Sequence, residues 1–346
     1  MQSNKKFFGL DIGTNAIRLV QLDSKASQTG LKNLVKYAHT PVDSKIIASD
    51  SKADRDQLSG IIKNLITQAN LNTKNVAVGM PSSKVFTAIV DVDKLKQSEM
   101  KKSIEFQADA FIPTPLESSI IDWTIIGDSP KDVTKSELLI SSTTTDYATS
   151  RLELIEAAGL NVIAFEPDVL AISRALIQSQ SNEVILIVDI GTRYTDIIVL
   201  INNNLRLSRS IPIGSESLVK SVAQNLNSEL NQAEQFLFKF GLSQDKLEGQ
   251  IYQSVINTIE NLMSEVDKSI KFFYSRYQNI KITKVIVSGA GAILPEFPLF
   301  VANYLKVAVE IGNAWLNVGF DMTLRPDLMA ISNQFTVAVG LAERNE

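Results

Sequence analysis

Two segments of this chain repeat one pattern, and the repeat limits the fold more than any other feature of the sequence. Residues 7–22 read FFGLDIGTNAIRLVQL, and residues 185–200 read ILIVDIGTRYTDIIVL. Each segment has an apolar run, then Asp-Ile-Gly-Thr, then a second run rich in β-branched residues. This order is typical of a β-hairpin with a buried first strand and a tight glycine turn. We infer two related halves, each opening with the same hairpin.

The rest of the chain alternates strand-like and helix-like segments, which indicates an α/β protein. A helix is also expected directly after Gly214, and a turn at 202–204. The segments between the two repeats, residues 82–162, predict a compact β-α-β-β-α unit. Strands are expected at 31–38, 75–80, 86–92, 119–126, 137–141 and 284–288, and helices at 58–69, 97–111, 146–158, 232–240, 251–277 and 332–342.

Composition excludes several classes of function. The chain has 346 residues, 45% hydrophobic and 21% charged, which fits a globular protein of two or more domains. It has no cysteine and one histidine, His39, so thiol chemistry, disulfides and multi-histidine metal sites are excluded. A net charge of -4 gives no sign of a nucleic-acid surface. No apolar run reaches the ~20 residues of a membrane span and no signal peptide precedes the first repeat, so we expect a soluble cytoplasmic protein.

The repeated turn is suited to binding phosphate. Gly13 and Gly191 let the backbone approach a ligand closely, and successive N–H groups in such a turn form an anion-binding concavity. Asp11 and Asp189, at the ends of the buried strands, could hold a Mg²⁺ ion that keeps part of its water. Two facing hairpins would hold a phosphate chain from both sides. The alternative is a tight hairpin with a polar turn, and the second copy in matching context favours phosphate.

A third segment, VIVSGAGAIL at 285–294, runs from a strand into small residues. Such a turn lets a flat ring lie against the backbone, although many α/β turns have the same composition. Its place after the second hairpin and three predicted helices makes a nucleotide base the favoured ligand.

These motifs resemble those of the actin, Hsp70 and sugar-kinase superfamily. DIGTNAIRLV is similar to its first phosphate loop, DIGTRYTDIIVL to its second, and VSGAGAIL to its adenosine motif. More narrowly, the chain resembles the FtsA-like PilM family of type IV pilus assembly proteins, and the likeness extends over nearly the whole chain. The segments that carry it are IEFQADAFIPTPLE (104–117), IEAAGL (155–160), Glu166-Pro167, RSIPIG (209–214) and AVGLA (338–342).

The resemblance implies an actin-like ATPase fold with duplicated two-lobed domains, an FtsA-type inserted subdomain, and ATP with Mg in a central cleft. Four subdomains are expected. Subdomain 1A consists of residues 1–81, 163–182 and 332–346, and the inserted subdomain 1C of residues 82–162. Subdomain 2A consists of residues 183–226 and 283–331, and subdomain 2B of residues 227–282.

The resemblance also assigns site residues by position. Asp11 and Asp189 are the candidate metal ligands. Glu166 is the candidate catalytic residue, placed to orient water or hydrated Mg²⁺, and its alternative is a helix N-terminal acid. Glu216 and Glu234 are candidates for the ribose, and their alternative is a solvated helix residue. The nucleotide-binding candidates are Asp11, Gly13, Thr14, Asn15 and Arg18 in the first loop, Asp189, Gly191, Thr192, Arg193, Tyr194 and Thr195 in the second, Gly214, and Gly289, Ala290, Gly291 and Ala292 at the adenine.

Three positions depart from the family pattern. Arg18 stands where the first hairpin usually has lysine, and Arg193 where the second loop usually has a small residue. Leu237 takes the place of a lysine that the family directs toward the nucleoside. We expect Leu237 to face the nucleoside with this contact missing; in the alternative, Leu237 packs on the base.

The function that the resemblance implies is assembly rather than turnover, with at most weak ATPase activity. ATP would lock the two halves together, and the inserted subdomain would help to bind the cytoplasmic N-terminal peptide of a PilN-like inner-membrane protein. The pilus motor ATPase and a second copy of the chain are further candidate partners, and no membrane insertion is expected. The alternatives are an FtsA-like cell-division protein, the cytoplasmic domain of a type II secretion protein, and a small-molecule kinase, for which no catalytic base stands out.

Overall fold

The computed structural model describes residues 6–26, 30–49, 51–95, 99, 104, 109, 111–178 and 181–345. The chain forms two compact units. Unit 1 consists of residues 1–175, 317–322 and 337–346, and unit 2 of residues 176–316 and 323–336. Each unit contains one of the two repeated hairpins, so the duplication read from the sequence is confirmed at this level, while the finer division into four subdomains stays a prediction.

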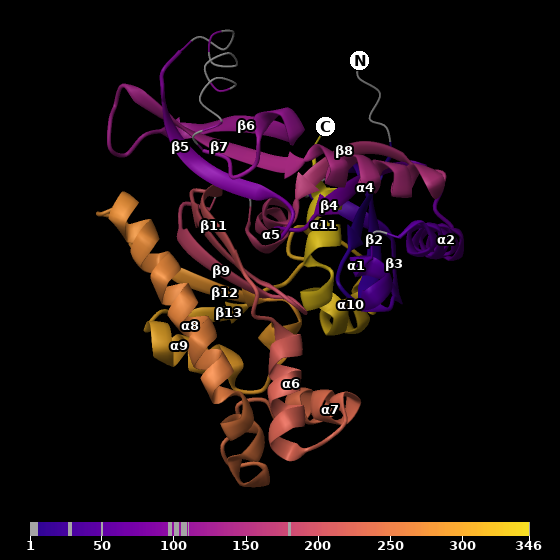
Figure 1. Ribbon diagram of the computed structural model, residues 1–346, viewed down its shortest axis with the longest axis vertical. Coiled ribbons are helices and arrows are strands. Elements are labelled where there is room, and N and C mark those ends of the chain that lie inside the picture. Colours follow the sequence, from indigo (N-terminus) through magenta and orange to yellow (C-terminus); the bar gives the residue numbers. More distant parts are fainter. Residues whose placement is uncertain are drawn as a thin grey trace. The chain divides into compact units, whose positions relative to one another are not determined.

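Unit 1 is built on a six-stranded sheet in the order β14-β3-β2-β1-β4-β8 (Figure 1). The first hairpin, β1–β2, is antiparallel, while β4 lies parallel to β1, and β8 parallel to β4. Successive residues of a strand point to opposite faces of the sheet. Because Val76, Ala77 and Val78 of β4 are all buried, both faces of the sheet are covered at this strand. The strands are β1 (Phe8–Ile12), β2 (Ala16–Ala26), β3 (Lys32–Pro41), β4 (Asn75–Met80), β8 (Asn161–Pro167) and β14 (Val318–Gly319).

Helices cover both faces of this sheet. Val76 and Val78 of β4 share a core with Leu58 of α2 and with Ile155 of α4. Ala77, on the opposite face, packs with helices α5 and α11. Helix α2 begins after Ser51, whose hydroxyl accepts a hydrogen bond from the Asp54 amide and so caps the first turn. The helices are α1 (Ser44–Ala48), α2 (Lys52–Gln68), α4 (Thr145–Ala157), α5 (Asp168–Leu176) and α11 (Thr336–Glu343).

A separate three-stranded antiparallel sheet lies between β4 and α4 in the sequence. Its order is β5-β7-β6, with β5 at Phe86–Asp93, β6 at Ser119–Asp128 and β7 at Lys135–Thr144. These strands have a small core of their own, centred on Leu138 and Ile140. The helix expected at 97–111 lies almost entirely outside the described residues. Helix α4 places Leu154 and Ile155 in the core of the six-stranded sheet, so its packing differs from that of the three strands before it.

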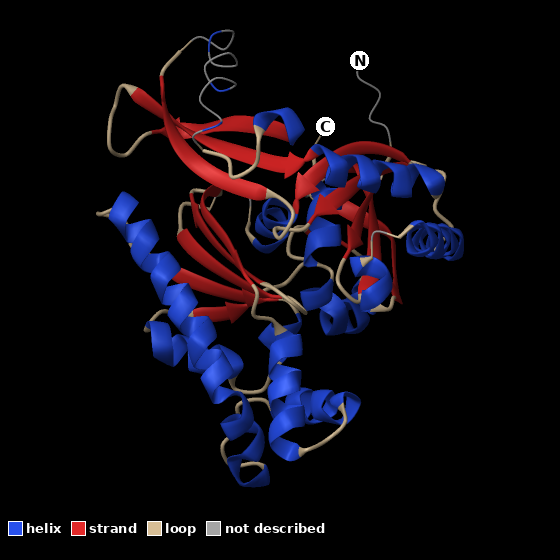
Figure 2. Cartoon of the chain, in the orientation of Figure 1, coloured by secondary structure: helices blue, strands red, loops and turns tan. Residues whose placement is uncertain are grey.

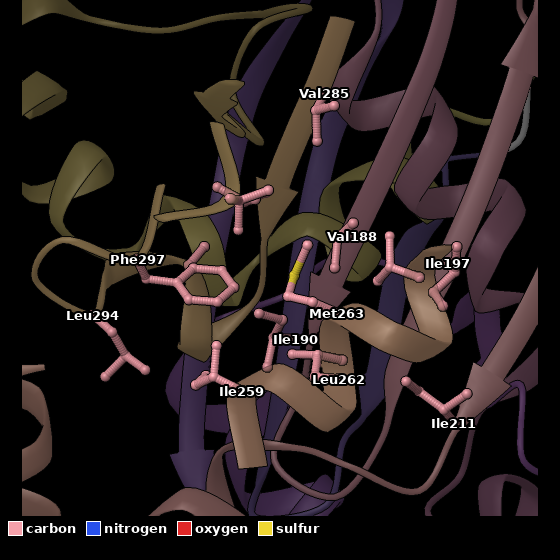
Figure 3. Packing of buried hydrophobic residues seen from close by; sticks show 14 of the residues in the cluster. Val188, Ile190, Ile197, Ile211, Ile259, Leu262, Met263, Val285, Leu294 and Phe297 are labelled. Carbon is pink, nitrogen blue, oxygen red and sulfur yellow. The ribbon is translucent and has the colours of Figure 1, made fainter. Parts of the chain in front are cut away.

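Unit 2 is built on a five-stranded sheet in the order β11-β10-β9-β12-β13. The long helix α8 lies along it, and Ile259, Leu262 and Met263 pack against Val188 and Ile197 of the sheet (Figure 3). The elements are β9 (Val184–Ile190), β10 (Thr195–Ile201), β11 (Asn204–Ile211), β12 (Lys284–Ser288), β13 (Val309–Ile311), α6 (Ser215–Leu226), α7 (Leu230–Phe240), α8 (Gln250–Arg276), α9 (Phe297–Leu305) and α10 (Arg325–Ile331). Figure 2 distinguishes the helices from the strands.

The single helix predicted over 332–342 is wrong at its start. Residues Ser332–Gln334 form a separate 3-10 turn, and α11 begins only at Thr336. The Ser332 hydroxyl accepts a hydrogen bond from the Ala314 amide, and the Asn333 side chain donates to the Gly289 carbonyl. Because these polar side chains bond to distant backbone, the chain turns more tightly here than the apolar periodicity suggests. Among the residues that the structure describes, no helix combines the length and apolar character needed to cross a membrane.

Candidate functional site

The first DIGT turn places a buried ion pair beside glycine. The Gly13 amide donates to the Ala16 carbonyl at 3.0 Å, which closes the predicted hairpin turn. Asp11 lies opposite Arg18 in the strand register, and Arg18 Nη1 is 3.2 Å from Asp11 Oδ2. A Cβ atom at Gly13 would lie 3.0 Å from the same Nη1. Glycine therefore lets the backbone of the turn approach the ion pair closely.

The charge of Asp11 is sensitive to what lies beside it. Burial raises the pKa of the Asp11 carboxyl, and the neighbouring Arg18 opposes this shift without cancelling it. The Arg18 Nε atom is buried without a hydrogen-bond partner in the structure. A group that binds here thus meets the Asp11 carboxyl, which a nearby cation would stabilise in its charged form. It also meets the Arg18 guanidinium, which has one N–H group available to donate. Thr14 is half-buried and Asn15 is exposed in the same turn.

The second DIGT turn has the same backbone bond. The Gly191 amide donates to the Tyr194 carbonyl at 2.9 Å, as Gly13 does to the corresponding residue of the first turn. Asp189 is half-buried at the end of β9, and Tyr194 is exposed. The buried Thr195 hydroxyl donates to the Ile213 carbonyl at 2.6 Å, so it supports the loop that leads into α6. Both hairpins predicted from the repeat are confirmed.

Helix α6 is attached directly to the second turn. Its first amides, at Ser215 and Glu216, donate to the carbonyls of Gly191 and Thr192 at 3.0 and 2.9 Å. A Cβ atom at Gly214 would lie 2.5 Å from the Thr192 oxygen, so only glycine permits this approach. The need for glycine at 214 is therefore explained by backbone packing, and its role toward a nucleotide stays a prediction.

Glu216 is held by two cations. Arg193 Nε lies 3.2 Å from one carboxylate oxygen and Lys220 Nζ lies 2.6 Å from the other. The hydrogen bond from Lys220 is the main cause of the lowered pKa of Glu216. Sequence reasoning did not identify Lys220, although the i, i+4 spacing from Glu216 on a helix is a recognisable signal. The unusual Arg193 thus has a partner within its own unit.

The small-residue turn after β12 lies against the second DIGT segment. Gly289 has a φ of 77°, and a Cβ atom there would lie 2.4 Å from the Ile190 carbonyl oxygen. A Cβ atom at Gly291 would lie 2.5 Å from the Ile190 side chain. Ser288 is the register partner of Asp189 in the parallel pair β9–β12. The structure therefore brings together two predicted site segments, with Gly289, Gly291 and Ala292 buried and Ala290 half-buried.

Two other predicted residues have surroundings that the sequence did not suggest. Glu166 is buried at the end of β8, and its two carboxylate oxygens are paired with Arg174 and Arg344. Leu237 is fully buried in the core of unit 2, so the expectation that it faces a nucleoside is wrong. Ala233 and Leu237 are four residues apart and form the inward face of α7, while Glu234 is exposed.

The carboxylates available here fit a magnesium ion that keeps much of its water better than a metal ion fully enclosed by protein side chains. No group of three or more acidic or histidine side chains that could enclose a metal occurs among the described residues. Mg²⁺ in nucleotide sites keeps several waters and binds one or two carboxylates together with phosphate oxygens. Single carboxylates such as Asp11 and Asp189 meet that requirement.

Comparisons with known proteins agree with this reading of the fold. The profile of the family "Type IV pilus assembly protein PilM" matches residues 9–346. Cell division protein FtsA of Bacillus subtilis (strain 168) is 22% identical over 355 residues, covering 90% of this chain and 80% of FtsA. The chain is also similar to a solved structure titled PilM-PilN type IV pilus biogenesis complex, with a TM-score of 0.84, 22% identity and 98% of both chains covered.

A more distant structure with the same architecture is MreB5 of Spiroplasma citri bound to ADP. Its TM-score is 0.54 at 12% identity, with 98% of this chain and 95% of that chain covered. Together these likenesses establish the actin-like ATPase fold predicted from the sequence.

Proposed function

Because the chain belongs to the PilM family of type IV pilus assembly proteins, we propose that it is an actin-like assembly protein that binds ATP and a PilN-like partner. The observation that carries the proposal is the family match over residues 9–346, together with the likeness in fold to a chain solved in a complex with PilN. The protein acts in the cytoplasm, held at the inner membrane by its protein partners. The pilus motor ATPase and a second copy of the chain are further partners within this proposal.

Each DIGT turn is a phosphate-binding element in this proposal. Gly13 and Gly191 would let backbone amides approach phosphate, and Asp11 and Asp189 are the carboxylates that would hold a hydrated Mg²⁺ ion. The close approach of the Gly13 backbone to the Asp11–Arg18 pair supports the first assignment. Gly289 and Gly291 pack on Ile190, so the small-residue turn adjoins the second DIGT turn, and adenine would bind beside it in this proposal. Magnesium supplies positive charge that offsets the phosphates, and the protein supplies the position.

The protein binds ATP for conformational locking rather than for turnover. Glu166, the candidate for orienting water, has both oxygens committed to guanidinium groups. A general base must be within hydrogen-bond reach of the proton it takes and free to accept it. The pairing of Glu166 therefore favours slow hydrolysis or none.

The partner peptide binds beside the three-stranded sheet. Strand β6 is an edge strand of that sheet, and Ile120 and Ile125 on it are 49% and 52% exposed. An edge strand can pair with an extended peptide, and apolar side chains along it give that pairing specificity. A PilN-like protein would offer such a peptide at its cytoplasmic N-terminus.

Calorimetric titration tests both parts of the proposal. The chain should bind Mg-ATP, and it should bind a synthetic peptide copied from the cytoplasmic N-terminus of the PilN-like protein of the same genome. A scrambled peptide of equal composition is the control. No heat from the native peptide, with or without ATP, would refute the partner assignment, whereas no heat from ATP alone would refute the nucleotide assignment.

A further inference from the structure

The chain passes between its two units four times, after residues 175, 316, 322 and 336. Three of these passages lie close to Arg174 within unit 1. Arg174 itself stands at the first passage, on α5. Its carbonyl oxygen accepts a hydrogen bond from Asn317 Nδ2 at 3.0 Å, just after the second passage. Its Nη1 donates to the Gly340 carbonyl at 2.5 Å, just after the last.

The same arginine is one of two that pair with a buried carboxylate. The Glu166 side chain is only 3% exposed, and it accepts hydrogen bonds from Arg174 Nη2 and, at 2.9 Å, from Arg344 Nη1. Arg344 directly follows α11. A carboxylate this deeply buried is costly unless it is paired and hydrogen-bonded, so loss of either arginine leaves one carboxylate oxygen without its charged partner.

A lysine from β3 also binds the end of α11. Lys32 Nζ donates to the Glu343 carbonyl at 3.1 Å and to the Arg344 carbonyl at 2.8 Å. The last carbonyls of a helix have no partner within the helix, and Lys32 satisfies two of those near the end of α11. Lys32 also stands opposite Val318 in the register of β3 and β14, so the same strand end holds segment 317–322.

Helices α5 and α11 touch through their backbones. A Cβ atom at Gly340 would lie 1.9 Å from the Ala171 carbonyl oxygen, a distance that no side chain tolerates. Gly340 therefore allows Arg174 to reach the carbonyl of α11 directly. The contact is close enough that small shifts of α11 would break the hydrogen bond.

We propose that Glu166, Arg174 and Arg344 form an ionic anchor that fixes α11 in unit 1, and with it the last passage from unit 2. One buried carboxylate thus holds segments that are distant in the sequence. Glu166 is a positioning residue in this arrangement. Release of the anchor frees α11 first, because Arg344 and Gly340 both belong to that end of the chain.

Amide hydrogen exchange on the nucleotide-free chain tests the anchor. Glu166→Gln and Arg344→Ala should each make the amides of α11 exchange at least tenfold faster, with those of α2 and α8 within twofold of the unmodified chain. Arg344→Lys keeps the charge and should restore most of the protection. Arg55→Ala is the matched control, since Arg55 pairs at 3.6 Å with Glu153, whose side chain is 64% exposed.

Unchanged exchange of α11 in both Glu166→Gln and Arg344→Ala would overturn the proposal. Equal acceleration in α2, α8 and α11 would overturn it as well, because it would indicate general loss of stability rather than a local anchor. No nucleotide or partner is present in this experiment, so its result is independent of the proposed function.

Discussion

At the scale of single residues, the Asp11–Arg18 pair gives the most direct test of the nucleotide site. Asp11→Asn removes the charge that would face hydrated Mg²⁺ and leaves Arg18 without its 3.2 Å partner. We expect Mg-ATP affinity to fall at least tenfold, about 1.4 kcal/mol, by calorimetric titration. Asp245→Asn is the control because Asp245 is an exposed acid paired with Lys246. Equal affinity in both variants would contradict the assignment.

Glu343 should make stability depend on pH. Burial raises the pKa of its carboxyl from 4.5 to about 8, against the attraction of Arg174 and Lys32. Between these two values the folded chain keeps a proton that the unfolded chain loses, so the free energy of unfolding falls as pH rises, by at most about 1.4 kcal/mol per pH unit. Below about 4.5 and above about 8 this contribution is constant.

Removal of that carboxylate should flatten the pH dependence. Urea unfolding of Glu343→Gln at pH 5, 6.5 and 8 should show a smaller loss of stability than the unmodified chain over the same range. Glu234→Gln, at an exposed position of α7, should leave the loss unchanged. A Glu343→Gln variant with the original slope would show that the carboxyl titrates normally.

Leu237 provides a test of the corrected core assignment. Leu237→Lys places an ammonium group among the buried side chains of unit 2, so we expect a loss of about 3 kcal/mol or more in unfolding free energy. The missing-contact hypothesis instead requires a stable protein with tighter ATP binding. Gln235→Lys, at an exposed position of the same helix, should be nearly neutral. Chemical unfolding and ATP titration of both variants separate the two outcomes.

At the scale of elements, the three-stranded sheet can be deleted while the whole of α4 stays in the chain. The Thr143 hydroxyl donates to the Lys84 carbonyl at 2.8 Å, and Phe86 lies opposite Ser142, so the chain enters and leaves this sheet at neighbouring points. Replacement of residues 86–142 by a short Gly-Ser link should abolish binding of the PilN-like peptide and preserve Mg-ATP binding. Undiminished peptide affinity in the folded deletion would contradict the assignment of the peptide to strand β6.

Such a deletion must retain α4 because of its packing. Deletion of all of residues 82–162 would also remove Leu154 and Ile155 from the core of the six-stranded sheet. Circular dichroism and thermal unfolding of the shorter deletion provide the check that unit 1 is still folded.

Local sequence patterns predicted most elements but not the contacts between distant ones. The hairpins, α2, α8 and β12 follow from apolar periodicity and glycine turns, which act within a few residues. The pairing of Glu166 with Arg344 joins residues far apart in sequence, and no local pattern encodes it. Leu237 was misread because a lysine expected from family resemblance outweighed its i, i+4 spacing from Ala233. The split at 332–336 was missed because it depends on bonds to Ala314 and Gly289.

At the scale of the whole molecule, we expect ATP to stabilise the folded protein and to be hydrolysed only slowly. ATP at 100 times its dissociation constant should add about 2.7 kcal/mol to the free energy of unfolding by mass action. Hydrolysis should stay below roughly 0.1 s⁻¹, against a median of roughly 10 s⁻¹ for enzymes. Thermal unfolding with ATP and phosphate release on the same sample give both numbers. Fast release stimulated by a sugar or small acid would instead indicate a kinase.

Unit 1 consists of segments that are distant in the sequence, and this affects how the protein folds during synthesis. Residues 337–346 belong to unit 1, yet the ribosome reaches them only after every residue of unit 2 has been synthesised. Leu341 from this last piece is fully buried against Ala77 and Ala171. Until it emerges, that face of the nascent sheet has α5 against it but lacks α11. Unit 1, which begins the chain, is thus completed after unit 2, and chaperones can meet the incomplete face while unit 2 is being synthesised.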